Sequence, residues 1–214
     1  MPELTIAPAI LVSTFEEFTT ATRKIEGYLP YGQIDVMDGQ FVPARSFEDV
    51  EKINTLDTKL QWELHLMVNH PLAEMTKWAT IKNVWRVIFH IESHDAPLEC
   101  IEFARSHNWQ VGIALNPDTP LAEVEPYFSQ LNVVQFMTVY PGQYGAPFVP
   151  KVGQKIQAFT KLSPRPLCAV DGAVSAATIP LLKSWGVEIF NAGSALMKAR
   201  DVQKAYLELQ QVLK

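Results

Sequence analysis

Three segments of this sequence place acidic or imidazole side chains where they could transfer protons or hold a metal ion. Asp35 lies in QIDVMDG, His65 in ELHLM and Asp171 in AVDGA. Carboxylates and imidazoles are general acids and bases, and they are also ligands for divalent metal ions. A lone histidine is more often an ordinary hydrogen-bonded core residue, so a chemical role depends on the three segments converging.

The elements that must position these residues alternate along the whole chain. Short runs rich in β-branched residues are followed by longer segments of helical periodicity, which is typical of βαβ units and a parallel sheet. We expect eight strands, at residues 5–10, 33–37, 61–67, 84–90, 110–115, 133–139, 166–170 and 188–191. This number predicts closure into a (β/α)₈ TIM barrel. No linker interrupts the pattern, so residues 1–214 are expected to form one domain.

Helix starts are marked by oxygen side chains that can accept hydrogen bonds from first-turn amides. Thr14, followed three residues later by Glu17, predicts a capping box, with Phe18 and Ile25 on the apolar face of the helix. Three further starts of this kind are expected at Asp95, Thr119 and Asp201. These helices would pack on the outside of the barrel.

The carboxyl ends of barrel strands meet at one rim, where the chemistry of such barrels collects. Alternation along the second strand puts Gln33, Asp35 and Met37 on one face. If this face is the lumen, Asp35 is buried, which costs several kcal/mol unless the carboxylate is paired or bound to a metal. His90 ends the fourth strand and is either a further site residue or a hydrogen-bonded rim histidine.

Loops after the seventh and eighth strands often bind phosphate in barrels of this kind. Here these loops contain Gly172 and Ala173, and then Gly193 and Ser194. Small residues let backbone amides approach an anion, so the two loops together predict a phosphate site.

Composition excludes several classes of function. The net charge is −5 and no basic stripe is present, which argues against a nucleic-acid partner. No apolar run approaches the roughly 18 residues that span a membrane, and no leader precedes the first strand, so we expect a cytoplasmic protein. Cys100 and Cys168 match no zinc or redox spacing and are expected to be buried free thiols.

Eight segments follow, in order, the motifs of ribulose-phosphate 3-epimerases: IAPAIL, IDVMDGQFVP, ELHLMV, FHIE, ALNPDTP, MTVYPGQYGAPF, VDGAV and NAGSA. The combination of DVMDG, FVP and a later HLM is the most specific part of the match. The chain therefore resembles this family over nearly its whole length. The resemblance implies a ribulose-phosphate-binding barrel that interconverts ribulose 5-phosphate and xylulose 5-phosphate through an enediolate. It also implies a divalent metal (zinc, manganese, iron or magnesium) and a homo-oligomer.

The resemblance assigns roles to individual residues. Asp35 and Asp171 match the two acid/base aspartates, which act on opposite faces of the substrate and also bind the metal, and His65 matches a third metal ligand. The expected lining of the substrate pocket is Met37, Met67, His90 and Met137. The expected phosphate-binding residues are Gly145, Gly172, Ala173, Gly193 and Ser194.

The chain also departs from the family pattern. Gln33 stands where the family has a histidine ligand, and Ala9 stands where it has a serine. The loop at residues 141–146 and the second small residue after strand seven, Ala173, are altered as well. An amide oxygen in place of an imidazole nitrogen weakens affinity for zinc and favours harder cations. The exchange at Gln33 therefore predicts a weakened metal site, or none.

Three functions follow from these observations. The first is a sugar-phosphate epimerase, on ribulose 5-phosphate or on another substrate admitted by the altered loop. The second is a non-catalytic family member that binds a phosphorylated sugar or a partner protein. A decarboxylase or aldolase fits less well, because the chain lacks an Asp-x-Lys-x-x-Asp strand and has no lysine at an expected strand end. Retention of Asp35, His65 and Asp171 together favours the enzyme.

Overall fold

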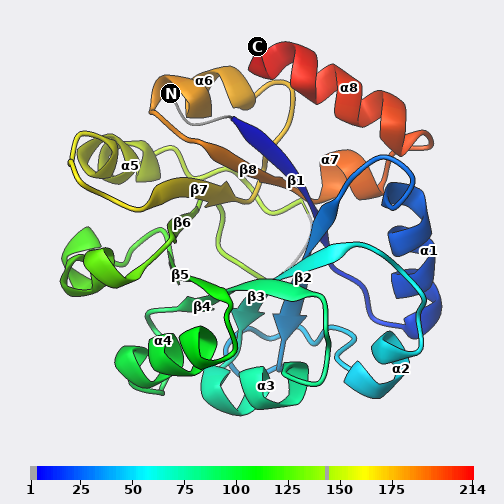
Figure 1. The fold of residues 1–214 in the computed structure, drawn as a ribbon. Helices are drawn as coiled ribbons and strands as arrows, with labels where there is room; N and C mark the ends of the chain where they lie inside the picture. Colours follow the sequence, from blue (N-terminus) through cyan, green and yellow to red (C-terminus); the bar gives the residue numbers. More distant parts are fainter. Residues whose placement is uncertain (1–3, 143–144) are drawn as a thin grey trace.

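The computed structural model describes residues 4–142 and 145–214. Within these residues, eight parallel strands pair in sequence order, and the last pairs with the first, so that the sheet closes into a barrel (Figure 1). The strands are β1 (Thr5–Ile10), β2 (Tyr31–Met37), β3 (Gln61–Met67), β4 (Val84–His90), β5 (Gln110–Leu115), β6 (Val133–Met137), β7 (Leu167–Asp171) and β8 (Ile189–Ala192). The predicted TIM barrel is confirmed.

Helices surround the barrel on its outside (Figure 1). They are α1 (Phe15–Ile25), α2 (Val50–Asn54), α3 (Pro71–Trp78), α4 (Pro97–Ser106), α5 (Val152–Thr160), α6 (Ile179–Ser184), α7 (Ser194–Met197) and α8 (Val202–Leu213). Between β5 and β6 two short 3₁₀ helices, η1 (Leu121–Glu123) and η2 (Glu125–Gln130), take the place of an α-helix.

The predicted strands agree with the observed ones to within two residues at each end. Four of the eight have the predicted bounds. β7 ends one residue later than expected, so Asp171 is the last residue of the strand. β6 ends two residues earlier, at Met137, and Val139 beyond it lines the pocket described below.

Two of the four predicted helix caps are confirmed. The Thr14 hydroxyl accepts from the Glu17 amide at 3.2 Å, and the Glu17 carboxylate accepts from the Thr14 amide at 3.2 Å. Asp201 accepts from the Lys204 amide at 2.9 Å at the start of α8.

The predicted caps at Asp95 and Thr119 are wrong. The Asp95 carboxylate accepts from the Leu72 amide at 2.9 Å, in the first turn of α3 rather than of α4. The Thr119 hydroxyl donates to the Glu92 carboxylate. A proline follows each residue closely and brings no N–H to the first turn, so partners from other elements compete successfully for both side chains.

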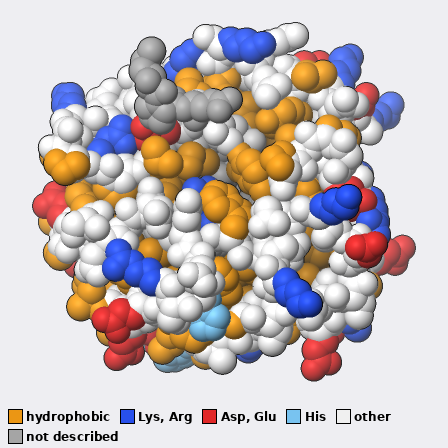
Figure 2. All heavy atoms as spheres, in the orientation of Figure 1, with side chains coloured by type: hydrophobic (Ala, Val, Ile, Leu, Met, Phe, Trp, Pro, Cys, Tyr) orange, Lys and Arg blue, Asp and Glu red, His pale blue; other side chains and the backbone are white. Residues whose placement is uncertain are grey.

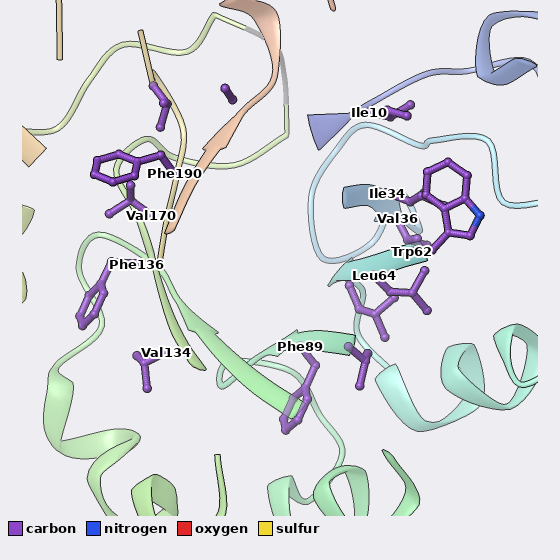
Figure 3. Close-up of a cluster of buried hydrophobic side chains, with 14 of the residues drawn as sticks. Ile10, Ile34, Val36, Trp62, Leu64, Phe89, Val134, Phe136, Val170 and Phe190 are labelled. Carbon is purple, nitrogen blue, oxygen red and sulfur yellow. The ribbon is translucent and has the colours of Figure 1, made fainter. Parts of the chain in front are cut away.

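Alternation along the strands separates two layers of side chains. Outward-facing residues form the core between the sheet and the helices, and Ile34, Leu64, Phe136 and Phe190 lie in this layer (Figure 3). The inward-facing apolar residues form a smaller cluster, which is Ile88, Ala114, Val133, Ala169 and Ile189, with Leu167 packed against it.

On the face shown in Figure 2, basic and acidic side chains are scattered and most lie toward the edge. Among the described residues, no helix is both long enough and apolar enough to cross a membrane. Cys100 and Cys168 are buried free thiols, as predicted.

Gly112 provides a test of how tightly the barrel interior is packed. A Cβ atom there would overlap Val133 Cγ1 and lie 3.0 Å from the Val133 carbonyl oxygen. We expect Gly112→Ala to lower the free energy of unfolding by about 1–3 kcal/mol, because overpacking forces neighbours to move. Gly27→Ala is the control, since a Cβ atom at Gly27 meets nothing within 4 Å. Urea unfolding of both variants measures the difference, and equal stabilities would contradict the packing described.

Candidate active site

The carboxyl ends of the strands surround a pocket that, with its open mouth, occupies about 530 Å³. Asp35 from β2 and Asp171 from β7 lie in its wall, and Met67 and Met137 provide apolar surface beside them. The remaining described lining residues are Ala9, Leu11, Val139, Pro141, Gly142, Gly145, Ala146, Gly172, Ala173, Val174, Asn191, Gly193 and Ser194. Of the predicted site residues, this pocket brings together nine.

Asp35, His65 and Asp171 converge at the base of the pocket, as the sequence predicted. The register of β2 and β3 places Asp35 directly beside His65. His65 Nδ1 lies 3.0 Å from Asp35 Oδ1 and 3.0 Å from Asp171 Oδ2. The two aspartates are only 7% and 8% exposed, and His65 is completely buried. One imidazole N–H thus lies between two buried carboxylates.

Gln33 lies beside the same two carboxylates. Its Nε2 is 2.9 Å from Asp35 Oδ1 and 2.9 Å from Asp171 Oδ2. Its Oε1 accepts from Asn191 Nδ2 at 2.6 Å, and the same Nδ2 donates to Gln135 Oε1 at 2.7 Å. Side chains from β2, β8 and β6 therefore form a buried chain of amides under the site.

His90 lies behind His65 and is not among the described residues that line the pocket. Its Nε2 is 3.0 Å from His65 Nε2, and its Nδ1 is 3.1 Å from Glu92 Oε2. Glu92 Oε1 accepts in turn from the Asn116 amide at 2.8 Å. Met37 is also outside the lining and packs against Met67 and Val42.

The electrostatics of the site follow from burial and close charges. Burial and the charge of Asp171 raise the pKa of Asp35 to about 6, against the hydrogen bonds from His65 and Gln33. Burial alone would lower the pKa of His65, but hydrogen bonds and charges from Asp171 and Asp35 outweigh it and raise that pKa to about 10. Burial lowers the pKa of His90 despite Glu92. These opposite shifts favour a hydrogen bond in which His65 Nε2 donates to His90 Nε2.

Asp35, His65 and Asp171 fit a divalent metal ion by both chemistry and spacing. One ligand atom from each lies within 4.8 Å of the others. Carboxylate oxygens and an imidazole nitrogen suit zinc, iron and manganese, and a three-residue set leaves positions open for a substrate.

The five predicted phosphate-binding residues line the same pocket as the aspartates. Gly172 and Ala173 both have positive φ, +104° and +51°, and a Cβ atom on Gly172 would collide with Val139. Ser194 is the first residue of α7. Ala9, where the family pattern has a serine, is also in the pocket wall. Gln143 and Tyr144 of the altered loop lie outside the described residues.

Sequence reasoning missed three polar residues that complete the site: Gln135, Asn191 and Glu92. Alternation along VVQFM and IFNA could have indicated that Gln135 and Asn191 face the lumen, because both are the polar members of apolar strands. Glu92 follows His90 after the end of β4 and carries no such signal.

Comparison with known proteins gives one consistent result. A family model described as the ribulose-phosphate 3 epimerase family matches residues 5–197. Ribulose-phosphate 3-epimerase of Bacillus subtilis is 31% identical over 214 residues, covering 96% of this chain and 97% of that protein. The enzyme of Schizosaccharomyces pombe is 30% identical over 212 residues, which cover 95% of this chain and 91% of that protein.

Solved structures share the fold at much lower identity. 3-Hexulose-6-phosphate synthase from Salmonella typhimurium superposes with a TM-score of 0.73 at 16% identity, covering 98% of both chains. 3-Keto-L-gulonate-6-phosphate decarboxylase from Vibrio cholerae gives 0.72 at 13% identity, covering 100% of this chain and 98% of that one. These likenesses support the barrel alone, whereas the sequence matches decide the family. The chain belongs to the ribulose-phosphate 3-epimerase family.

Proposed function

We propose that this protein is a sugar-phosphate 3-epimerase that interconverts ribulose 5-phosphate and xylulose 5-phosphate by two-base proton transfer. The observation that carries the proposal is the pair of buried carboxylates, Asp35 and Asp171, each 3.0 Å from the same His65 nitrogen at the base of one pocket.

Epimerisation at C3 requires removal of the proton α to the ketone and return of a proton to the opposite face. One carboxylate must therefore lie on each side of the carbon. Asp35 and Asp171 project from β2 and β7, which are separated by β1 and β8 around the barrel, so they can approach a bound sugar from different sides. A base works best when its pKa is near the working pH, and the raised pKa of Asp35 suits this role.

The enediolate formed by proton removal needs positive charge or hydrogen-bond donors close to its oxygens. The protonated His65 between the two carboxylates supplies positive charge at this position. A divalent ion held by Asp35, His65 and Asp171 would supply Lewis-acid stabilisation of the same oxygens when bound.

The phosphate of the substrate would bind in the same pocket, against the backbone of Gly172, Ala173, Gly193 and Ser194. None of the described residues that line the pocket is a lysine or an arginine. Binding of the phosphate would therefore depend on backbone N–H groups of closely approaching small residues rather than on a charged side chain.

Replacement of either aspartate by asparagine tests the role of each base individually. We expect Asp35→Asn and Asp171→Asn each to lower epimerisation by about 10²–10⁴-fold, the usual contribution of a general acid or base. Each variant should retain solvent-deuterium exchange at C3 from only one of the two epimers, because one base remains for one face. NMR of C3 deuteration measures this.

The control for these variants is Asp57→Asn, at an exposed position, which should exchange at the wild-type rate. Absence of exchange in the wild-type protein under every metal condition would refute the epimerase and leave the non-catalytic sugar-phosphate binder. Equal residual exchange from both epimers in either variant would refute the two-base assignment.

Ala173 tests the conformation of the proposed phosphate loop. Ala173 has a left-handed backbone conformation, which costs a residue with a side chain about 1–2 kcal/mol. Glycine avoids this strain, but its unfolded chain has more conformational freedom, which offsets part of the gain in stability. We expect Ala173→Gly to raise the free energy of unfolding by about 0.5–1 kcal/mol. The exposed Ala176→Gly should instead be neutral or destabilising. Chemical denaturation measures both, and destabilisation by Ala173→Gly would contradict the backbone conformation.

A further inference from the structure

We propose that Gln33 is a positioning residue whose side-chain amide donates one N–H to each acid/base carboxylate and contributes no ligand to a bound metal. The acid/base roles of Asp35 and Asp171 in this inference rest on the proposed function. The contacts of the Gln33 side chain are given by the structure and do not depend on that function.

The distances require both hydrogens of the amide. Gln33 Nε2 lies 2.9 Å from Asp35 Oδ1 and 2.9 Å from Asp171 Oδ2. A carboxylate without its proton can only accept, so the donor must be the Gln33 NH₂ group, which has two hydrogens to give. Gln33 is completely buried, so no bulk water competes for these bonds.

Asn191 and Gln135 fix which end of the Gln33 amide faces the carboxylates. Asn191 Nδ2 donates to Gln33 Oε1 at 2.6 Å and to Gln135 Oε1 at 2.7 Å, so both of its hydrogens are used. If Gln33 turned over, its oxygen would face two carboxylate oxygens and its NH₂ group would face that of Asn191. The rotation would break three hydrogen bonds among groups that are at most 8% exposed.

This orientation sets the relation of Gln33 to a metal ion. An amide NH₂ group is a donor and offers no lone pair for coordination, whereas the oxygen that could coordinate is held by Asn191. An ion would then be held by Asp35, His65 and Asp171, and the two N–H donors would compete with it for the carboxylates. At the position where the family pattern has a histidine ligand, this chain has a pair of hydrogen-bond donors.

The test is a titration of metal-stripped protein with Mn²⁺, in which electron paramagnetic resonance measures binding. This measurement needs no catalytic turnover. We expect Gln33→Ala to bind Mn²⁺ at least as tightly as the wild type. His65→Ala should bind at least 10-fold more weakly, which shows that the assay reports this site. Gln61→Ala, at an exposed position at the start of β3, is the matched control and should not change affinity. A 10-fold or greater loss in Gln33→Ala would show that the amide oxygen is a ligand and overturn the proposal.

Gln33→Glu separates the shape of the side chain from its hydrogen-bond donors. The two residues are nearly isosteric, but a carboxylate cannot donate to Asp35 and Asp171. We expect Mn²⁺ affinity to rise at least 10-fold in Gln33→Glu. We expect kcat for epimerisation, compared in the metal condition where the wild type is active, to fall at least 10-fold with KM within 3-fold. Unchanged affinity and kcat would overturn the positioning role. If the wild type shows no epimerisation under any metal condition, the proposed function fails, while the Mn²⁺ measurements still decide the orientation of Gln33.

Discussion

Two carboxylates buried side by side are the constraint from which the rest of the site follows. Asp35 and Asp171 repel each other and lose hydration in the same cavity, and burial and the charge of Asp171 both raise the pKa of Asp35. Gln33 and His65 offset this by donating hydrogen bonds to both. Gln33 and His65 are themselves buried, so the other polar atom of each side chain also needs a hydrogen-bond partner. Asn191 is the partner of Gln33 Oε1, and His90 is the partner of His65 Nε2.

Besides this polar layer, the barrel interior holds a small apolar cluster and a buried ion pair between Arg86 and Glu63. Ala114 on β5 and Ala169 on β7 pair with Gln135 in the strand register and belong to the apolar cluster. Gln33 and Gln135 both reach Asn191 although they begin on separate strands. The side chains that hydrogen-bond to the two carboxylates, Gln33 and His65, thus come from strands β2 and β3 rather than from the loops.

A proton and a bound metal ion would compete for one atom in this site. His65 Nδ1 carries the hydrogen that bridges the two carboxylates, and a metal ligand must be deprotonated. Two carboxylates with a protonated imidazole have a net charge of −1, whereas the same groups with a divalent ion and a neutral imidazole are uncharged. Either arrangement compensates most of the buried negative charge. The residues around the aspartate pair therefore suit more than one state of charge.

The sequence by itself determined the barrel and the convergence of its chemical groups. Strand alternation and strand order are local patterns, and they were enough to place Asp35, His65 and Asp171 at one rim. Only the tertiary structure decided the hydrogen-bond partners. Asp95 caps a neighbouring helix, and the Gln33 amide is oriented by Asn191, 158 positions away in the sequence. A polar side chain binds the nearest suitable partner in space, and in a closed barrel that partner comes from strands that no local pattern connects.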